Sequence, residues 1–216
     1  MAQLEELIDR VAPGRPVDLA GFSMGGIIVS EYARRHEQRV RKIALFAPGG
    51  VGNKLPAMAR MAIAPGVGEY LMRVTGSRQL RPTRRNLLHA DRFAALDERF
   101  ARTTRFEGSR RAVLRSLRNM PLEEWGDGFR ELGRQRKPIL LVWGRQDAVV
   151  PFRHAEAVRA LLNAEDLVVF EDAGHAVMVE RPDEVNRTLV GFLRDATLTG
   201  RSAHAWREKE APLPSR

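Results

Sequence analysis

The chain has 216 residues, a hydrophobic fraction of 44%, no cysteine and a formal net charge of +9. This length allows one domain with a full core, or one domain that carries a helical insertion. The lack of cysteine excludes disulfides, thiolate catalysis and cysteine-based metal sites, and it fits a cytoplasmic location. We expect no stable membrane insertion, because the longest uncharged run, Leu19 to Ser30, is shorter than the roughly 20 residues that span a bilayer.

The positive charge is concentrated in one part of the chain. Residues 51–137 contain 19 basic and 9 acidic residues, and the remainder is close to neutral. Arginine supplies 32 of the 36 basic residues, and no nucleic-acid recognition module accompanies them. We therefore expect a solvated arginine-rich surface and no nucleic-acid partner. Attraction of anionic substrates or membrane surfaces is the alternative.

The first fifty residues predict a short helix followed by a βαβ unit. Four apolar residues recur at helical spacing and form one face of an amphipathic helix: Leu4, Leu7, Ile8 and Val11. The apolar run from Val17 to Phe22, bounded by proline and glycine, predicts a buried parallel strand. A helix over 25–35 and a second strand over 40–47 complete the unit.

The middle of the chain, residues 51–137, contains no convincing strand. It predicts four to six short helices, among them 91–102, 109–120 and 122–134. Two further strands follow at 138–143 and 167–170. Two helices, over 151–162 and 182–193, accompany them. From residue 197 the chain becomes polar and charged, and we expect a loosely held tail.

The segment Gly21-Phe22-Ser23-Met24-Gly25-Gly26 has the Gly-x-Ser-x-Gly pattern of a nucleophile elbow. Such a turn lifts the serine above the carboxyl edge of the sheet, at the cost of an unfavourable backbone conformation. Glycines at 21, 25 and 26 would let strand and helix approach without Cβ clashes. The backbone N–H of Met24 would serve as one oxyanion donor. Taken alone, the pattern also fits a turn in which small residues merely pack.

Two residues further along the chain favour the catalytic interpretation. Asp147 follows one predicted strand and His175 follows the last one, so both stand at the same edge of the sheet as Ser23. A serine hydroxyl needs a base to remove its proton, which makes this trio typical of nucleophilic catalysis. Asp172 is the second candidate for the acid. The remaining histidines are expected on the surface: His36, His89, His154 and His204.

Together these segments resemble the α/β-hydrolase fold superfamily. Leu19 to Gly26 is similar to its elbow and Leu141 to Pro151 to its acid segment. Its histidine segment is matched by Gly174-His175 with Glu180, Pro182 and Asn186. The resemblance implies an α/β fold with a mostly parallel sheet and a helical cap. It divides the chain into core residues 1–50, a cap at 51–137, core residues 138–195 and a flexible tail at 196–216.

The resemblance also implies roles for the three residues. Ser23 would be the nucleophile, His175 the general base and then acid, and Asp147 the residue that orients the imidazole. No cofactor and no metal are implied. The string from Phe22 to Gly26 is shared by esterase-like, carbon–carbon-bond hydrolase-like and cofactor-free haloperoxidase-like members. A serine at position 23 disfavours dehalogenases and epoxide hydrolases, whose nucleophile is an aspartate.

The chain departs from the family before the elbow. Twenty residues precede Gly21, where the family has four strands and one helix, and the first loop of that region provides the second oxyanion donor. We therefore expect an N-terminally truncated core that lacks the first four strands and this donor, with strand 17–22 as an exposed edge. Three explanations stay open for this departure. The open reading frame starts upstream of Met1, the chain pairs with a partner, or the chain is a weakened remnant of a hydrolase.

These observations predict a serine hydrolase that acts on a small-molecule acyl substrate, ester-like or otherwise. Apolar residues scattered through the cap favour a substrate with a hydrophobic portion. The alternative is a non-catalytic or remnant hydrolase-like protein. Such a protein would act by association through its open sheet edge, as a homo-oligomer.

Overall fold

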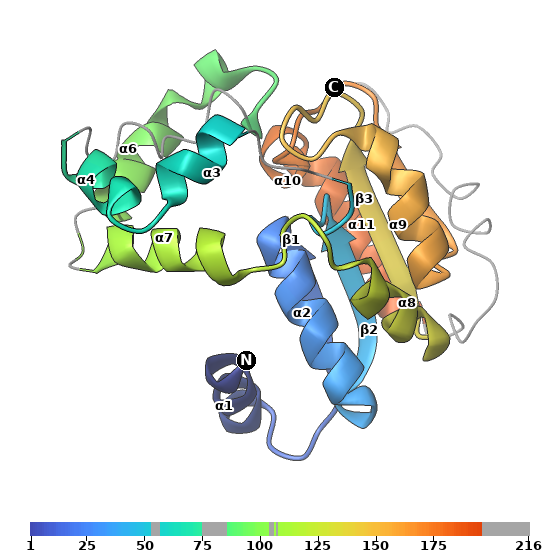
Figure 1. Ribbon diagram of the computed structural model, residues 1–216. Helices are drawn as coiled ribbons and strands as arrows, with labels where there is room; N and C mark the ends of the chain where they lie inside the picture. Colours follow the sequence, from blue (N-terminus) through green and yellow to red (C-terminus); the bar gives the residue numbers. More distant parts are fainter. Residues whose placement is uncertain (53–56, 75–85, 104–105, 107, 196–216) are drawn as a thin grey trace.

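A parallel sheet of four strands forms the centre of the chain (Figure 1). It is seen in a computed structural model that describes residues 1–52, 57–74, 86–103, 106 and 108–195. The strands follow one another in the order β1-β2-β3-β4 and all pair in parallel. Their bounds are β1 Val17–Phe22, β2 Val40–Phe46, β3 Ile139–Gly144 and β4 Asp166–Phe170. The four predicted strands and their parallel arrangement are thereby confirmed.

Apolar side chains on both faces explain why these short runs form buried strands. In β2, Ile43 and Leu45 contact one hydrophobic cluster, whereas Ala44 and Phe46 contact the other. In β3 the alternation repeats, and every residue of the strand is buried. Successive side chains of a strand point to opposite faces, so an unbroken apolar run fits only a sheet that is covered on both sides.

Helices cover both faces of the sheet (Figure 1). The first cluster contains side chains of α2 (Met24–Arg35), α8 (Gly126–Arg134) and α9 (Ala155–Leu162). The second contains side chains of α10 (Val177–Glu180) and α11 (Pro182–Arg194). Two of these helices start later than the sequence predicts. A 3₁₀ turn at Phe152–His154 precedes α9, and α8 begins four residues after the predicted start at 122.

Helix α8 packs with the core layer, although the predicted boundary of the insertion places it in the cap. Phe129 and Leu132 are fully buried in the same cluster as the strand residues Leu45 and Leu141. Gly133 also lies so close to α9 that a Cβ there would be 2.5 Å from the carbonyl oxygen of Leu161. The apolar face of α8 thus belongs to the core, while the boundary at residue 137 and the other domain limits stay predictions.

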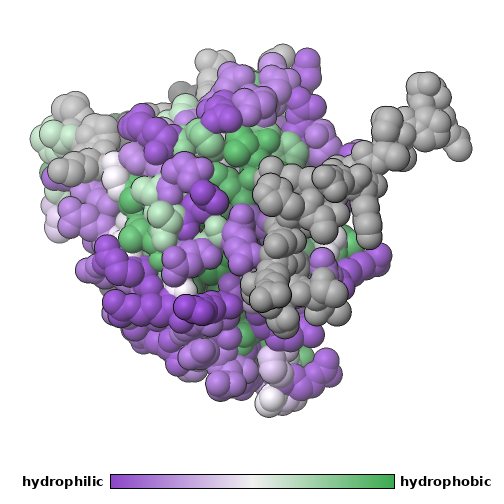
Figure 2. Space-filling view, turned by 90° about the vertical axis from the view of Figure 1, so that its right-hand side faces the viewer, coloured by the Kyte–Doolittle hydropathy of each residue, from purple (hydrophilic) through white to green (hydrophobic). Residues whose placement is uncertain are grey.

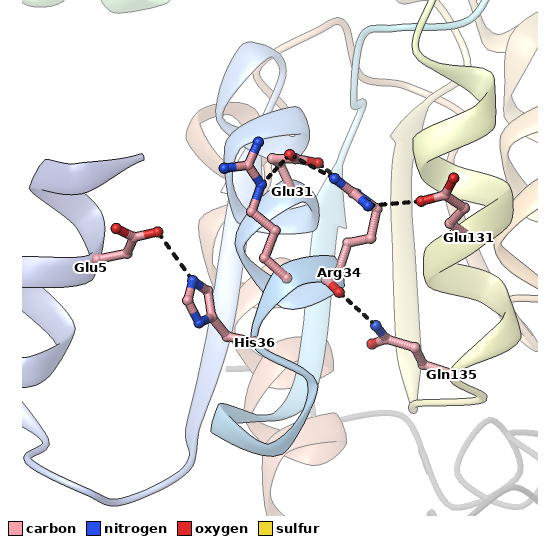
Figure 3. Close-up of polar contacts among 7 residues, drawn as sticks. Glu5, Glu31, Arg34, His36, Glu131 and Gln135 are labelled. Atoms are coloured by element: carbon pink, nitrogen blue, oxygen red, sulfur yellow. Dashed lines mark hydrogen bonds and ion pairs between the residues drawn. The ribbon is translucent and has the colours of Figure 1, made fainter.

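Helix α1 (Ala2–Val11) packs on the core with only part of its predicted apolar face. Ile8 is buried and Leu4 packs on the core, whereas Leu7 and Val11 are 54% and 67% exposed. Polar contacts attach the helix: His36 Nε2 lies 3.1 Å from the carboxylate of Glu5 (Figure 3). The prediction of an amphipathic helix is correct, but half of its apolar stripe faces solvent.

A polar network joins α2 to α8 on the outside of the core. Figure 3 shows Arg34 between Glu31 and Glu131, and Gln135 donates a hydrogen bond to the carbonyl oxygen of Arg34. The hydrogen bond from Arg34 lowers the pKa of Glu31. Because the network lies at the surface, each ion pair contributes only about 0–1 kcal/mol to the free energy of unfolding.

The described part of the insertion is helical, as predicted. It contains α3 (Ala57–Ile63), α4 (Val67–Val74), a 3₁₀ turn at Ala90–Phe93, α6 (Ala94–Thr103) and α7 (Ser109–Asn119). Figure 1 shows α3, α4, α6 and α7 grouped on one side of the sheet. Arg118 of α7 connects the group, because its guanidinium pairs with Glu69 at 2.6 Å and donates to the carbonyl oxygen of Ala64. This pairing lowers the pKa of Glu69 to about 2.

The surface has two features that bear on partners. Figure 2, which faces the right-hand side of Figure 1, shows mostly hydrophilic residues with hydrophobic ones gathered in the upper part. Among the described residues, no helix combines the length and the apolar character that crossing a bilayer requires. Strand β1 has one neighbour, β2, within the described sheet, and Ala20 at its centre is exposed. The predicted tail at 196–216 lies outside the described residues.

Candidate active site

Ser23 lies in the sharp turn between β1 and α2, as the motif predicts. Its backbone has φ 53° and ψ −119°, a conformation that costs a residue with a Cβ on the order of 1–3 kcal/mol. Neighbouring backbone groups hold the turn: the Ser23 N–H donates to the carbonyl oxygen of Phe46, and Gly26 N–H donates to the carbonyl oxygen of Ser23. The sheet therefore stabilises a strained position, which is typical of functional residues.

Two of the three glycines around Ser23 occupy positions with no room for a Cβ atom. A Cβ on Gly21 would lie 2.6 Å from the carbonyl oxygen of Gly25 and 2.6 Å from the Val29 side chain. A Cβ on Gly26 would lie 2.7 Å from the Pro48 side chain. A Cβ on Gly25 would meet no described atom within 4 Å apart from its chain neighbours and the backbone of its own helix. A Cβ therefore has no room at Gly21 and Gly26, whereas Gly25 leaves room for one outside its own helix.

The difference between these glycines gives a first testable prediction. Replacing Gly21 with alanine should lower the free energy of unfolding by about 1–3 kcal/mol, because backbone atoms would have to move apart. Gly25→Ala is the matched control: it should leave stability unchanged or raise it by up to about 1 kcal/mol, since alanine favours helix over glycine. Urea denaturation of both variants measures the free energy of unfolding. An equal loss of stability in the two variants would contradict the different steric roles of Gly21 and Gly25.

Asp147 and His175 are in direct contact although 28 residues separate them. His175 Nδ1 lies 2.7 Å from Asp147 Oδ2, and both side chains are almost completely buried. The other carboxylate oxygen, Oδ1, accepts hydrogen bonds of 2.8 Å from the backbone N–H groups of Val149 and Val150. These three contacts hold the carboxylate with Oδ2 toward the imidazole.

The ring of His175 lies beside the elbow. Its centroid is 4.7 Å from that of Phe22, the residue before Ser23. Among the described residues, no hydrogen bond joins the Ser23 hydroxyl to His175. The N–H of Met24 opens α2 and has no acceptor in the described part of the chain, which leaves it available to an oxyanion. The expected lack of a second oxyanion donor stays a prediction.

Gly144, at the end of β3, allows the loop of His175 to approach the sheet. A Cβ on Gly144 would overlap the carbonyl oxygens of Ala173 and Gly174. The N–H of Gln146 also donates to the carbonyl oxygen of Ala173 at 3.1 Å. In the sequence, Gly144 marks only the end of a strand. Its role in the site depends on a contact across 30 residues, which no local pattern reveals.

The second candidate for the acid, Asp172, points to the surface. Its carboxylate pairs with Arg181 at 2.8 Å, and its side chain is 62% exposed. Asp147 was the preferred acid, and it is the one that contacts His175. Closeness in sequence therefore does not bring a carboxylate into contact with the histidine, whereas the sheet places Asp147 next to His175.

Among the described residues, none of the other histidines forms a hydrogen bond or an ion pair with Asp147 or His175. His36 contacts Glu5, and the backbone N–H of His89 donates to Glu180. His154 is half-buried against Gly52, where a Cβ would lie 2.7 Å from its Nδ1. Desolvation lowers the pKa of His154, which favours its neutral form. His204 lies outside the described residues.

A cavity of about 610 Å³ lies between α2 and the start of α8. Five of its twelve lining residues are acidic, among them Glu31, Glu124 and Asp127. Two of these acids are in ion pairs, Glu31 with Arg34 and Asp127 with Arg130. The cavity contains none of the three candidate catalytic side chains.

Glu180 is a residue near the site whose role the sequence does not reveal. In the sequence it is only part of the segment that resembles the family's histidine segment. In the structure its carboxylate accepts a hydrogen bond of 2.6 Å from Gly174 N–H, immediately before His175. A carboxylate five residues after the candidate base is visible in the sequence, but its partners are not.

Comparison with known proteins gives the family. A family model described as the alpha/beta hydrolase fold matches residues 2–182. A 2-hydroxy-6-oxononadienedioate/2-hydroxy-6-oxononatrienedioate hydrolase from Comamonas testosteroni is 30% identical, over 81% of this chain and 62% of that protein. The dihydrolipoyllysine-residue acetyltransferase component of the acetoin cleaving system from Cupriavidus necator is 30% identical over 88% of this chain and 50% of that protein. The chain thus spans 50% to 62% of the length of these relatives.

Solved structures share the fold. An esterase from Exiguobacterium antarcticum superposes with a TM-score of 0.71 at 24% identity, over 89% of this chain and 71% of that one. A thermophilic esterase from Thermogutta terrifontis superposes with a TM-score of 0.70 at 21% identity, over 88% of this chain and 69% of that one. The elbow at Ser23, the parallel sheet and the match over residues 2–182 lead to one conclusion. The chain belongs to the α/β-hydrolase fold family.

Proposed function

We propose that this chain carries the catalytic residues of a serine hydrolase, with Ser23 as nucleophile, His175 as base and Asp147 as the orienting acid. One observation carries the proposal: a buried, hydrogen-bonded Asp147–His175 pair lies at the same sheet edge as a serine in a strained strand-to-helix turn. A strained serine alone, or a buried aspartate–histidine pair alone, has many structural uses. Their combination at one edge favours activated nucleophilic catalysis.

The geometry suggests how the proton would move. Asp147 accepts from His175 Nδ1, which holds the neutral imidazole with its Nε2 free to take the proton of Ser23 Oγ. Oγ then bonds to the carbonyl carbon, and the Met24 N–H donates to the oxygen that becomes negative. When the bond to the leaving group breaks, His175 returns the proton to that group. Water attacks the acyl-enzyme with His175 again as base, which releases the acid and restores Ser23.

The proposed substrate is a small acyl compound with a hydrophobic portion, either an ester or a compound cleaved at a carbon–carbon bond beside a carbonyl. The names of the Comamonas hydrolase and of the Exiguobacterium esterase support these two bond types. Large apolar side chains of the insertion are exposed and offer surface to such a substrate: Met61, Val67, Tyr70, Val74 and Phe106.

Fluorophosphonate labelling tests the nucleophile without knowledge of the substrate. We expect the chain to be labelled at Ser23 and to hydrolyse a short p-nitrophenyl ester, because a base-activated serine attacks both reagents. Ser23→Ala is the negative control and should show neither reaction. Labelling no faster than in Ser23→Ala, with a folded protein by circular dichroism, would overturn the proposal.

A second candidate function rests on a different observation, the single described neighbour of β1. Unpaired N–H and C=O groups along such an edge can pair with another strand. In this case the chain is a non-catalytic protein that associates with copies of itself through β1. Analytical ultracentrifugation distinguishes the candidates: a stable oligomer that fluorophosphonate does not label favours association, and a labelled monomer favours catalysis.

A further inference from the structure

Glu180, the last residue of α10, holds two chain segments together through its carboxylate. One oxygen, Oε2, accepts from Gly174 N–H at 2.6 Å. The other, Oε1, accepts from Leu88 N–H at 2.5 Å and from His89 N–H at 3.3 Å. Gly174 lies in the loop 171–176, which we call the histidine loop, and Leu88 and His89 lie in residues 86–89 of the insertion, which we call the return segment.

The return segment packs on the backbone on both sides of His175. The N–H of Ala176 donates to the carbonyl oxygen of Asn86 at 2.8 Å. A Cβ on Gly174 would lie 3.0 Å from Leu88 N and 3.1 Å from the Asn86 oxygen. A side chain at position 174 would therefore require the return segment to shift by a few tenths of an ångström. Leu87, in the middle of the return segment, is buried with 6% exposure.

These contacts complete the support of His175. The sheet supports the preceding part of the histidine loop, through the close contact with Gly144 and the bond from Gln146 N–H. Asp147 orients the imidazole itself. The return segment, bound through Glu180, supports the opposite side of the loop. Without Glu180, three N–H groups would lose a charged acceptor, and a charge-assisted hydrogen bond is about twice as strong as a neutral one.

We propose that Glu180 is a positioning residue that couples the return segment of the insertion to the backbone of His175. This inference rests on the proposed function, in which His175 is the base. Glu180 does not contact the reacting atoms; it acts through Gly174 and so sets where the imidazole stands relative to Ser23. A displacement of about 1 Å in such a group costs about 10²-fold in rate.

The test compares Glu180→Gln and Glu180→Ala with the control Glu184→Gln. Glu184 lies in α11, its side chain is 48% exposed, and it pairs only loosely with Arg181 at 3.5 Å. Glutamine keeps the volume of Glu180 and one acceptor, but it places an NH₂ group opposite one of the backbone donors. We expect the rate of fluorophosphonate labelling to fall about tenfold in Glu180→Gln and about 10²-fold in Glu180→Ala. With p-nitrophenyl ester, kcat should fall while KM changes by less than about twofold.

Two further readouts separate positioning from loss of structure. Amide hydrogen exchange of Gly174, Leu88 and His89 should become faster in the Glu180 variants and not in Glu184→Gln. The imidazole NMR signals of His175 should shift in the same variants. Faster amide exchange with unchanged labelling and unchanged His175 signals would overturn the inference. If Glu180→Ala does not fold, Glu180→Gln decides. If the unaltered chain is not labelled, the proposed function fails, and the His175 signals alone then decide whether Glu180 positions the ring.

Discussion

Replacing Asp147 with asparagine should lower kcat by about 10⁴-fold while the protein stays folded. Asparagine has nearly the same shape, and its carbonyl oxygen can still accept from the N–H groups of Val149 and Val150. Its NH₂ group then faces His175 Nδ1 in place of Oδ2, which makes Nδ1 an acceptor and moves the ring proton to Nε2. In that tautomer the imidazole cannot take the proton of Ser23.

Asp172→Asn is the matched control for this substitution. Asp172 lies in the histidine loop but pairs with Arg181 at the surface, so its replacement should leave kcat within about twofold of the unaltered chain. Hydrolysis of p-nitrophenyl ester by both variants measures the difference. A loss below tenfold in Asp147→Asn would show that the carboxylate does not set the tautomer of His175.

Replacing Gly144 with alanine should reduce stability and activity together. The added Cβ would overlap the carbonyl oxygens of Ala173 and Gly174, so either the histidine loop or the end of β3 has to move. We expect the free energy of unfolding to fall by about 1–3 kcal/mol. Because the loop carries His175, we also expect kcat to fall by about 10²-fold.

Gly191→Ala provides the control for this second substitution. Gly191 lies within α11, and a Cβ there would meet no described atom within 4 Å. This variant should keep its activity, and its free energy of unfolding should rise by up to about 1 kcal/mol, because alanine has a higher helix propensity than glycine. Urea denaturation and ester hydrolysis measure both effects. If Gly144→Ala left the urea midpoint of unfolding and the rate of ester hydrolysis unaltered, the histidine loop would tolerate displacement.

Secondary structure was largely predictable because its signals are local. The run Val17 to Phe22 predicts β1 residue for residue, since an apolar stretch bounded by proline and glycine has few alternatives. Helix starts were less predictable. The sequence predicts a helix from residue 122, but α8 begins at Gly126. Gly50 N–H donates to the carbonyl oxygen of Leu122 and Trp125 N–H donates to that of Gly50, which holds residues 122–125 outside α8. Such pairing across more than 70 residues has no local signature.

Packing roles were predictable only in part. The periodicity of Leu4, Leu7, Ile8 and Val11 predicts a helix, but not that Leu7 and Val11 face solvent. The glycines around Ser23 all suit an elbow by composition, yet only Gly21 and Gly26 lack room for a Cβ. Room at a position depends on what another segment places there, so periodicity and composition cannot decide it.

The sequence by itself determined the types of the elements, the order of the three motifs and the family resemblance, because these depend on neighbouring residues and on the direction of the chain. Only the tertiary structure decided that Asp147 and not Asp172 meets His175, and that Glu180 joins the histidine loop to the return segment. These contacts cross 28 and 92 residues. They form because parallel strands bring their carboxyl ends to one edge, where hydrogen-bond geometry selects among similar side chains.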